Sequence, residues 1–161
     1  MDFSHIDNDG RAKMVDVGDK IETDRLARAR ASIKMKPETL ELIKNGGVAK
    51  GDVLHTAKIA GIMAAKKTSE LIPMCHNIFL SGIDIAFNYF DCGIEILATS
   101  RAYAKTGVEM EALTAATVAA LTIYDMAKAV DKEMIISDIY CLKNQVVNLA
   151  SLSEDSVEKA T

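Results

Sequence analysis

The chain has 161 residues, of which 49% are hydrophobic, so it is long enough for one well-packed domain and too short for two ordinary ones. Its formal net charge of -4 argues against a general binder of nucleic acid or anionic membranes, because such binding depends on Lys and Arg displacing counterions. Composition and charge therefore favour a single globular domain that binds neither nucleic acid nor membrane.

The cysteines and the N-terminus indicate where the protein works. The three cysteines form no C-x-x-C pair and are odd in number, which supports neither a disulfide framework nor a zinc site. The first residues contain no apolar leader, and no apolar run reaches the length of a membrane span. We therefore expect a cytoplasmic protein.

The two ends of the chain differ from its middle. Residues 1–20 are polar, rich in Asp and Gly, and show no sustained period, so we expect a mobile N-terminal arm. One catalytic domain is expected over residues 21–150, followed by a disordered polar tail over 151–161. Within the domain, residues 21–35 alternate late in the stretch and predict a strand, although their Arg- and Ala-rich part can also be helical.

Two helices are expected next. Pro37 suits the first position of a short helix over residues 37–45, which a Gly-Gly pair ends. Asp52 suits the N-cap of a second helix over residues 53–71, whose apolar residues recur on one face. Pro73 closes that helix.

The second half of the chain predicts a hairpin, a long helix and a last strand. Residues 78–90 and 93–105 alternate on either side of an Asp-Cys-Gly turn, which predicts a β-hairpin. A long helix to Val130 follows, and residues 134–149 predict the last strand. The order β, α, α, β, β, α, β favours an α+β fold, with a ferredoxin-like antiparallel sheet and helices packed on one face.

The stretch from Lys105 to Val130 predicts an apolar helix with charged ends. Thr106 followed by Glu109 fits a capping box, which places the start of the helix near Gly107. The helix is rich in Ala, and Ala-rich helices approach one another closely. In so small a domain, this pattern suits either a tight core or a subunit interface.

Glu109 and Glu111 begin this helix. They lie about 200° apart around a regular helix, so we do not expect them to face the same point. The capping box explains Glu109, whereas Glu111 either favours the positive end of the helix dipole or serves as a substrate-side group.

Asp125 and Lys128 lie near the end of the same helix, on one face. They form either an ordinary surface pair or a positioned acid and base whose pKa values are shifted by buried neighbours. The fourteen residues from Glu111 to Asp125 span about 21 Å of helix, too far for one small substrate. If both ends are functional, the simplest geometry joins the start of this helix to the end of a neighbour's across a dimer interface.

Two further candidate site residues, Lys50 and His76, lie in turns next to expected helices or strands. Lys50 stands at the start of a helix, where free N–H groups favour a phosphate. Its spacing alone favours a solvated lysine after a glycine turn, and a phosphate site would need further partners. His76 falls in a turn between helix and sheet and suits either proton transfer or a structural role. The adjacent Cys75 lacks the usual spacing of a zinc ligand, so no metal is expected there.

Four strings in this sequence together resemble the MoaC family, the cyclic pyranopterin monophosphate synthases of molybdenum cofactor biosynthesis. These strings are MVDVGDK, AKGDVLHTAKIAGIMAAKKTSELIP, LIPMCH and KTGVEMEALTAATVAALTIYDMAKAV, and the resemblance covers about residues 5–143. It implies a lyase that converts 3',8-cyclo-7,8-dihydro-GTP, made by an upstream radical-SAM enzyme, to cyclic pyranopterin monophosphate and pyrophosphate. It also implies a homohexamer, a trimer of dimers with sites between subunits.

The resemblance also assigns roles to individual residues. It places acid/base and lysine chemistry on Asp125, Lys128 and Lys50. It places substrate contacts on Met74, Cys75, His76, Met110 and Glu111, with Glu109, Arg25 and Lys66 as additional neighbours. Besides Lys50, the cations available for a triphosphate are Arg25, Lys66 and Lys105. No cofactor is required by the sequence, and Mg²⁺ accompanying pyrophosphate is left open.

Two departures from the family pattern stand out. Asn77 replaces the usual proline after Cys-His, and the Gly- and Lys-rich segment after the last strand is absent, so Lys143 is the nearest available cation there. Two other functions are weighed against the lyase. One is a non-catalytic, nucleotide-binding regulatory oligomer of the same fold, and the other is a purely structural assembly domain, which leaves Lys50, His76, Asp125 and Lys128 unexplained.

Overall fold

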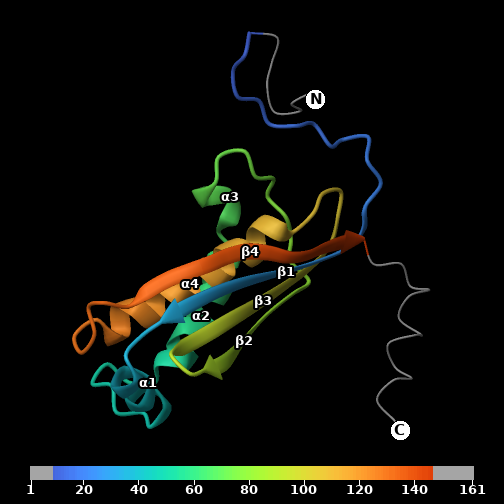
Figure 1. Ribbon diagram of the computed structural model, residues 1–161. Coiled ribbons are helices and arrows are strands. Elements are labelled where there is room, and N and C mark those ends of the chain that lie inside the picture. The colour runs from blue at the N-terminus through green and yellow to red at the C-terminus, as the bar shows by residue number, and fades with distance from the viewer. Residues whose placement is uncertain (1–8, 147–161) are drawn as a thin grey trace, which may run out of the picture.

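The computed structural model describes residues 9–146, which form a four-stranded antiparallel sheet covered by helices (Figure 1). The strand order is β2-β3-β1-β4, and the strands are β1 (Thr23–Lys34), β2 (Gly82–Phe90), β3 (Gly93–Ala104) and β4 (Ile135–Val146). The helices are α1 (Pro37–Lys44), α2 (Val53–Ala65), α3 (Thr68–Leu71) and α4 (Glu109–Ala127). The predicted α+β fold is confirmed. Residues 1–8 of the expected arm, and the expected tail, lie outside the described residues.

The core lies between the sheet and helices α2 and α4, which sit together on one side of it (Figure 1). Alternate residues of β1 point to that side, and Ala27, Ala29, Ala31 and Ile33 are fully buried. The strand predicted from the period of two is therefore confirmed, and the helical alternative for this Ala- and Arg-rich stretch is wrong.

Helices α2 and α4 approach each other closely at Gly61, which is buried. A Cβ atom at this position would lie 2.8 Å from the carbonyl oxygen of Ala115 and 3.3 Å from the Cβ of Ala119, and it would overlap the side chain of Ile85. The small residues of α4 are therefore required by a tight core, the first of the two explanations that the sequence left open.

Three local predictions were wrong. The second helix is interrupted after Ala65, and residues Thr68–Leu71 form a separate turn, α3. The strand expected from residue 78 begins at Gly82. Helix α4 begins at Glu109 with Val108 at its N-cap and no side-chain cap, so Thr106 and Glu109 do not form a capping box. The Glu109 carboxylate instead accepts a hydrogen bond from Asn144 of β4 at 2.9 Å, because a strand distant in sequence lies beside it.

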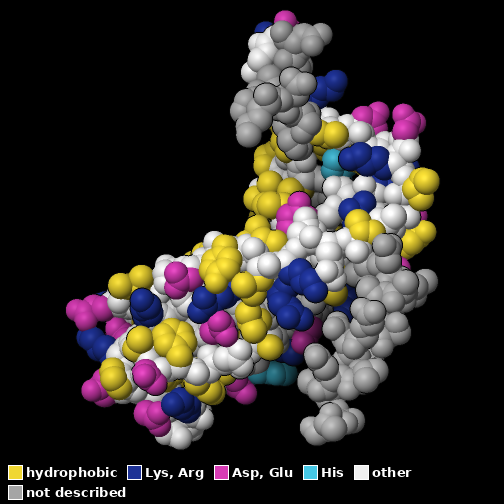
Figure 2. Space-filling view, turned by 45° about the vertical axis from the view of Figure 1, so that its right-hand side comes forward, with side chains coloured by type: hydrophobic (Ala, Val, Ile, Leu, Met, Phe, Trp, Pro, Cys, Tyr) yellow, Lys and Arg dark blue, Asp and Glu magenta, His cyan; other side chains and the backbone are white. Residues whose placement is uncertain are grey.

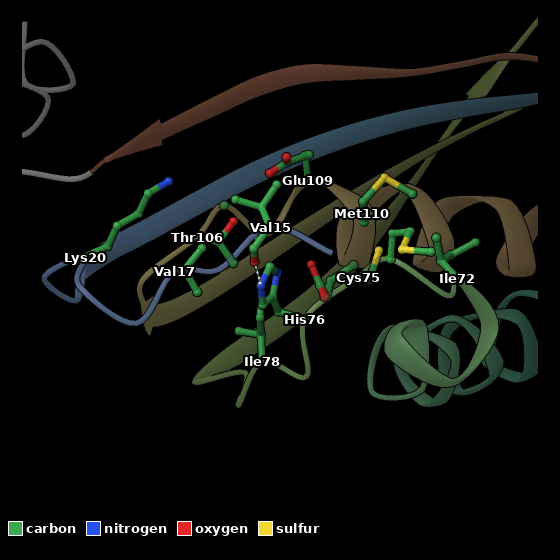
Figure 3. A pocket seen from close by; sticks show the side chains of 13 residues that line it. Val15, Val17, Lys20, Ile72, Cys75, His76, Ile78, Thr106, Glu109 and Met110 are labelled. Atoms are coloured by element: carbon green, nitrogen blue, oxygen red, sulfur yellow. Dashed lines mark hydrogen bonds between the residues drawn. The ribbon is translucent and has the colours of Figure 1, made fainter. Parts of the chain in front are cut away.

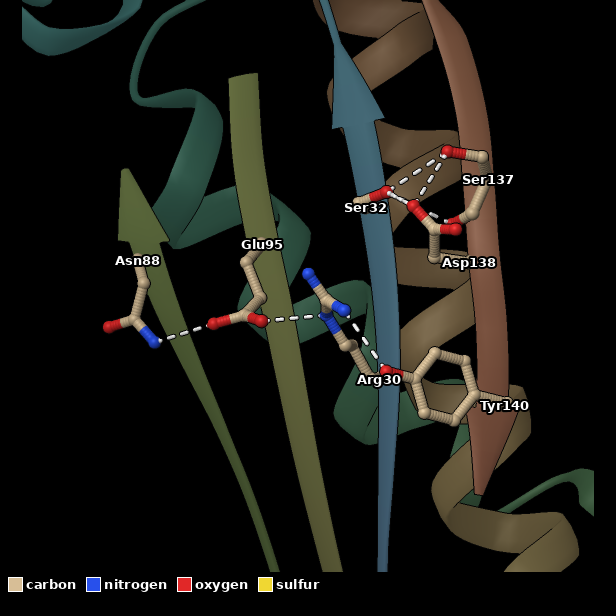
Figure 4. Close-up of polar contacts among 7 residues, drawn as sticks. All are labelled: Arg30, Ser32, Asn88, Glu95, Ser137, Asp138 and Tyr140. Carbon is tan, nitrogen blue, oxygen red and sulfur yellow. Dashed lines mark hydrogen bonds and ion pairs between the residues drawn. The ribbon is translucent and has the colours of Figure 1, made fainter. Parts of the chain in front are cut away.

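The other face of the sheet carries a polar network that crosses all four strands in sheet order (Figure 4). Asn88 donates to Glu95, which pairs with Arg30 at 2.6 Å, and Arg30 donates to the hydroxyl of Tyr140 at 3.0 Å. On the space-filling surface, hydrophobic side chains are interspersed with charged ones of both signs (Figure 2). Polar contacts fix this face, whereas apolar packing fixes the face below the helices.

Among residues 9–146, none of the helices combines the length and apolar character that crossing a bilayer would require.

We predict that Gly61→Val lowers the free energy of unfolding by about 1–3 kcal/mol, because the added side chain overpacks the contact between α2 and α4. Urea denaturation measures the change. Met63→Ala, at an exposed position of the same helix, serves as the control and should change stability by less than about 0.5 kcal/mol. Equal stability of Gly61→Val and the wild-type protein would contradict the close approach.

Candidate active site

A pocket of about 410 Å³ lies at the N-terminal end of α4 (Figure 3). Three chain segments far apart in sequence form its walls: the segment before β1, the turn after α3, and the start of α4. The lining residues are Val15, Val17, Lys20, Ile72, Met74, Cys75, His76, Ile78, Thr106, Gly107, Glu109, Met110 and Glu111. The volume falls within the usual range for small-molecule sites. Because Glu109 and Glu111 line it, it is called the carboxylate pocket.

Both glutamates at the start of α4 line this pocket, contrary to the expectation that they face different directions. Glu109 is the first residue of the helix, so its side chain is not bound by the spacing of a regular turn. Glu111 is only 3% exposed, and its Oε2 has no hydrogen-bond partner. Burial, with the nearby charge of Glu109, raises the pKa of Glu111. The pocket therefore holds a carboxyl group that is ready to bind a donor or keep a proton.

Cys75 and His76 enter the same pocket from the turn after α3. Burial and the charges of Glu111 and Glu109 raise the pKa of the Cys75 thiol, so it stays protonated at neutral pH. The Nε2 atom of His76 lies 2.7 Å from the carbonyl oxygen of Val15. Because a carbonyl can only accept, this ring nitrogen carries the hydrogen. Neither residue acts as a thiolate or as a base through Nε2 in this geometry.

The segment before β1 forms one wall of the pocket. Besides the contact of His76 with Val15, the Lys105 ammonium donates to the carbonyl oxygen of Gly18 at 2.7 Å. Lys20, from the same segment, lines the pocket together with Glu109 and Glu111. Lys105, considered a phosphate ligand from its sequence position, thus makes a structural contact here.

A second cluster lies at the other end of α4. Asp125 accepts a hydrogen bond from Lys128 at 2.6 Å through Oδ1, and from Lys50 at 2.9 Å through Oδ2. Lys50 also donates to the backbone carbonyl of Asp125 at 2.8 Å. The expected pair of Asp125 and Lys128 is therefore present, and the fold adds Lys50, which is 75 residues away in sequence.

Charge pairing, and not burial, sets the electrostatics of this cluster. The side chains of Lys50, Asp125 and Lys128 are 47%, 57% and 53% exposed. Hydrogen bonds from Lys128 and then Lys50 lower the pKa of Asp125 to about 2, and the carboxylate in turn raises the pKa of Lys128. The buried neighbours expected from the sequence do not cause these shifts. At neutral pH the cluster holds one anion and two cations.

A shallow hollow of about 390 Å³ adjoins this cluster. It is lined by Lys50, Tyr124, Lys128, Ala129 and Lys132. Three lysines around one hollow attract an anion with several charges, such as a di- or triphosphate. Sequence reasoning missed Lys132 here and Lys20 and Thr106 at the carboxylate pocket. An exposed lysine carries no signal of its position in a fold, and Thr106 was assigned to a helix cap.

The structure brings the predicted residues together in two groups and leaves two residues out. Met74, Cys75, His76, Met110, Glu111 and Glu109 line the carboxylate pocket, and Lys50, Asp125 and Lys128 form the lysine cluster. Arg25 donates to the carbonyl oxygen of Ala104 and does not line that pocket. Lys66 lines a separate hollow with residues 77–80.

The fold and these two groups define a small α+β protein that holds acid/base groups at both ends of one helix. The chain belongs to the MoaC family, whose model matches residues 14–146.

Relatives across several bacteria are similar over most of their length. One, named cyclic pyranopterin monophosphate synthase, from Peptoclostridium acidaminophilum, is 59% identical over 143 residues, covering 89% of this chain and 91% of its own. Proteins of the same name from Clostridium acetobutylicum and Novosphingobium aromaticivorans are 55% and 56% identical; they cover 88% and 86% of this chain, and 89% and 88% of their own lengths.

We predict that a carboxyl carbon NMR titration will give a pKa of about 2 for Asp125. Since this pKa is below the ordinary 3.8, the pairing stabilises the fold above pH 3.8 and is lost as the pH falls through about 2. Lys128→Met should move the pKa upward most, Lys50→Met less, and Lys132→Met not at all. High salt should also raise it, because the pair is exposed. An unchanged pKa in Lys128→Met would rule out this pairing.

We predict that Glu111→Gln raises the melting temperature at pH 7 while it weakens substrate turnover. The raised pKa of Glu111 means that its ionised form destabilises the fold above the ordinary value of 4.5. The increase in melting temperature should therefore disappear below pH 4.5, where wild-type Glu111 is protonated. Glu38→Gln, at an exposed position of α1, is the control and should have no effect. A variant that melts at or below the wild-type temperature at pH 7 would contradict the cost of burying this charge.

Proposed function

We propose that this protein is a cyclic pyranopterin monophosphate synthase. In this role it converts 3',8-cyclo-7,8-dihydro-GTP to cyclic pyranopterin monophosphate and pyrophosphate, a step of molybdenum cofactor biosynthesis. The observation that carries the proposal is the 59% identity over 143 residues to a relative of that name. The carboxylate pocket and the lysine cluster supply the two kinds of group that this chemistry needs.

The carboxylate pocket suits the base-derived ring of the substrate. The amide and amino N–H groups of a guanine-derived ring are donors, and Glu109 and Glu111 present carboxyl oxygens that accept from them. Met110 and Ile72 add apolar contacts to the ring faces. The open accepting position of Glu111 is satisfied once such a donor arrives, so substrate binding removes a cost that the free protein carries.

The lysine cluster suits the triphosphate and the proton transfers. In the last step a substrate hydroxyl attacks the α-phosphorus, the bond from that phosphorus to the bridging oxygen breaks, and pyrophosphate leaves with that oxygen. Lys50 and Lys128 stabilise the negative charge that develops on the leaving group. Asp125 orients both ammonium groups in the free protein. Once the triphosphate draws the lysines away, the pairing that lowers the pKa of Asp125 is lost, and its carboxylate accepts the protons that the ring-forming steps and the attacking hydroxyl release.

These two groups belong to one site only if two subunits share it. Glu111 and Asp125 are separated by about 21 Å along α4, whereas the substrate must contact both groups at once. A twofold axis near Val118, the midpoint between the two residues, would place the end of the partner's α4 beside the start of this one. We propose a homohexamer, a trimer of dimers, in which each site combines the pocket of one subunit with the lysine cluster of another.

The remaining parts of the proposal concern the surroundings of the reaction. An upstream radical-SAM enzyme supplies the substrate, and the protein works in the cytoplasm without a cofactor of its own. Mg²⁺ is expected to enter bound to the triphosphate and to leave with pyrophosphate.

The second candidate is a non-catalytic nucleotide-binding regulatory oligomer of the same fold, which the same residues fit. Asp125 pairs with both lysines in the free protein, and such pairing can also serve binding alone. Incubating the purified protein with the cyclised GTP and assaying pyrophosphate and the oxidised fluorescent pterin separates the two. Tight nucleotide binding without product above a blank would favour the regulator.

We predict that Lys50→Ala and Lys128→Ala each lower kcat by about 10²–10⁴, the range for loss of a positioned acid or base. The pyrophosphate assay measures the loss. Lys44→Ala, at a surface lysine of α1 that pairs with Glu41, is the control and should leave kcat unchanged. Normal turnover by both site variants would refute the assignment of the lysine cluster.

We predict that mixing two variants that are each impaired in one half of the shared site restores part of the wild-type activity. If Glu111→Gln and Lys128→Ala subunits are unfolded together and refolded at equal amounts, half of the dimers are mixed, and each mixed dimer contains one intact site. About a quarter of the sites should then regain wild-type activity. No recovery in refolded mixtures, with both single variants folded, would show that each subunit contains its own complete site.

A further inference from the structure

The C-terminal end of β4 reaches the carboxylate pocket through a residue to which neither the sequence patterns nor the comparisons assign a role. The Nδ2 group of Asn144 donates to Oε2 of Glu109 at 2.9 Å. The other carboxylate oxygen of Glu109 has no hydrogen-bond partner among residues 9–146. This side chain lines the pocket (Figure 3). Asn144 thus occupies one oxygen and leaves the second for a ligand.

A glycine makes room for this arrangement. A Cβ atom at Gly107 would overlap Oε2 of Glu109 and would lie 3.1 Å from both amide atoms of Asn144. The carboxylate of Glu109 and the amide of Asn144 therefore both lie against the bare backbone of Gly107 and contact each other there. Any side chain at position 107 would push the carboxylate out of this position.

A register shift in β4 decides that Asn144, and not Lys143, faces the pocket end of α4. Ala29 pairs with Cys141, but Arg28 pairs with Lys143 and Ala27 with Asn144, so Leu142 is an extra residue in the ladder. Ala27 is buried on the helix-covered face, and its partner Asn144 lies on that face too. Arg28 and its partner Lys143 lie on the opposite face.

This register corrects an expectation from the sequence. Lys143 was the nearest cation to the position where the family has a Gly- and Lys-rich segment, but its place on the opposite face directs it away from the pocket. A neutral amide stands beside Glu109 instead. An amide holds a carboxylate without neutralising it, so Glu109 keeps its negative charge for the substrate.

We propose that Asn144 is a positioning residue for substrate binding: together with Gly107 it fixes the carboxylate of Glu109 so that its second oxygen faces the ligand. The inference rests on the proposed function for its kinetic readout, and it adds a residue to the pocket that the lyase would use. Asn144 acts through Glu109 and does not itself touch the reacting atoms.

The test compares variants of Asn144 and Gly107, the two residues that contact the Glu109 carboxylate. Asn144→Ala should raise KM about tenfold, since a hydrogen bond to a charged group is lost, with kcat changed by less than about threefold. Asn144→Asp should raise KM further because it places a like charge beside Glu109. Gly107→Ala should also raise KM. Gln145→Ala, at the neighbouring amide on the opposite face, is the matched control and should leave both constants unchanged.

A double-mutant cycle separates positioning from a structural role. In a Glu109→Gln background, Asn144→Ala should raise KM no further, because Asn144 acts only through the carboxylate. A wild-type KM in Asn144→Ala, or the same rise in both backgrounds, would overturn the proposal. So would a lower melting temperature and a lower kcat at constant KM, which would mean that Asn144 only joins β4 to α4.

A crystal structure of Asn144→Ala gives a readout that does not depend on turnover. The Glu109 carboxylate should leave its position above Gly107, and an unmoved carboxylate would overturn the proposal even in an inactive protein. If the wild-type protein forms no product while the carboxylate moves as expected, the proposed reaction fails and the positioning by Asn144 stands.

Discussion

The close contact of α4 with α2 and with the sheet is the constraint on which the rest of the structure depends. Gly61 lets the two helices approach until a single added carbon would meet the backbone of Ala115. The fully buried alanines along α4 leave no space for adjustment. Helix α4 is consequently held by close packing along most of its buried side. Its ends, and every polar group attached to them, are held at a constant separation.

Different physical effects shift the pKa values of the carboxyl groups at the two ends of α4. At the N-terminal end, Glu111 is withdrawn from water, and desolvation raises its pKa. At the C-terminal end, Asp125 stays in water, and two lysines lower its pKa to about 2. The N-terminal end therefore holds a carboxyl group with an unused hydrogen-bond acceptor. The C-terminal end holds two lysines that an entering phosphate can draw away from Asp125. The N-terminal end suits a hydrogen-bond-donating ring and the C-terminal end suits a triphosphate, which are the two parts that the proposed shared site would bind.

The sheet packs against the core and also places a polar residue, Asn144, beside the pocket. On its uncovered face, a chain of polar contacts from Asn88 to Tyr140 links all four strands. Within β4 an extra residue, Leu142, turns Asn144 toward the helices and Lys143 away from them. One irregularity in an edge strand thus decides whether an amide or a cation stands beside Glu109. The choice matters because a cation would neutralise the carboxylate that the pocket offers to a ligand.

The sequence by itself determined the α+β fold, the order of the strands and helices apart from α3, and the residue types of the candidate site. Alternation in residues 21–35 and the helical spacing after residue 107 are local properties, and local periods follow from backbone geometry alone. Local reasoning failed at Glu109, where Asn144, 35 residues away, replaces a cap. Only the tertiary structure decided that Lys50 meets Asp125, that Glu109 and Glu111 share a pocket, and that Lys143 faces away. These outcomes depend on contacts between distant segments and on a one-residue shift in strand pairing, and no pattern within one segment encodes either.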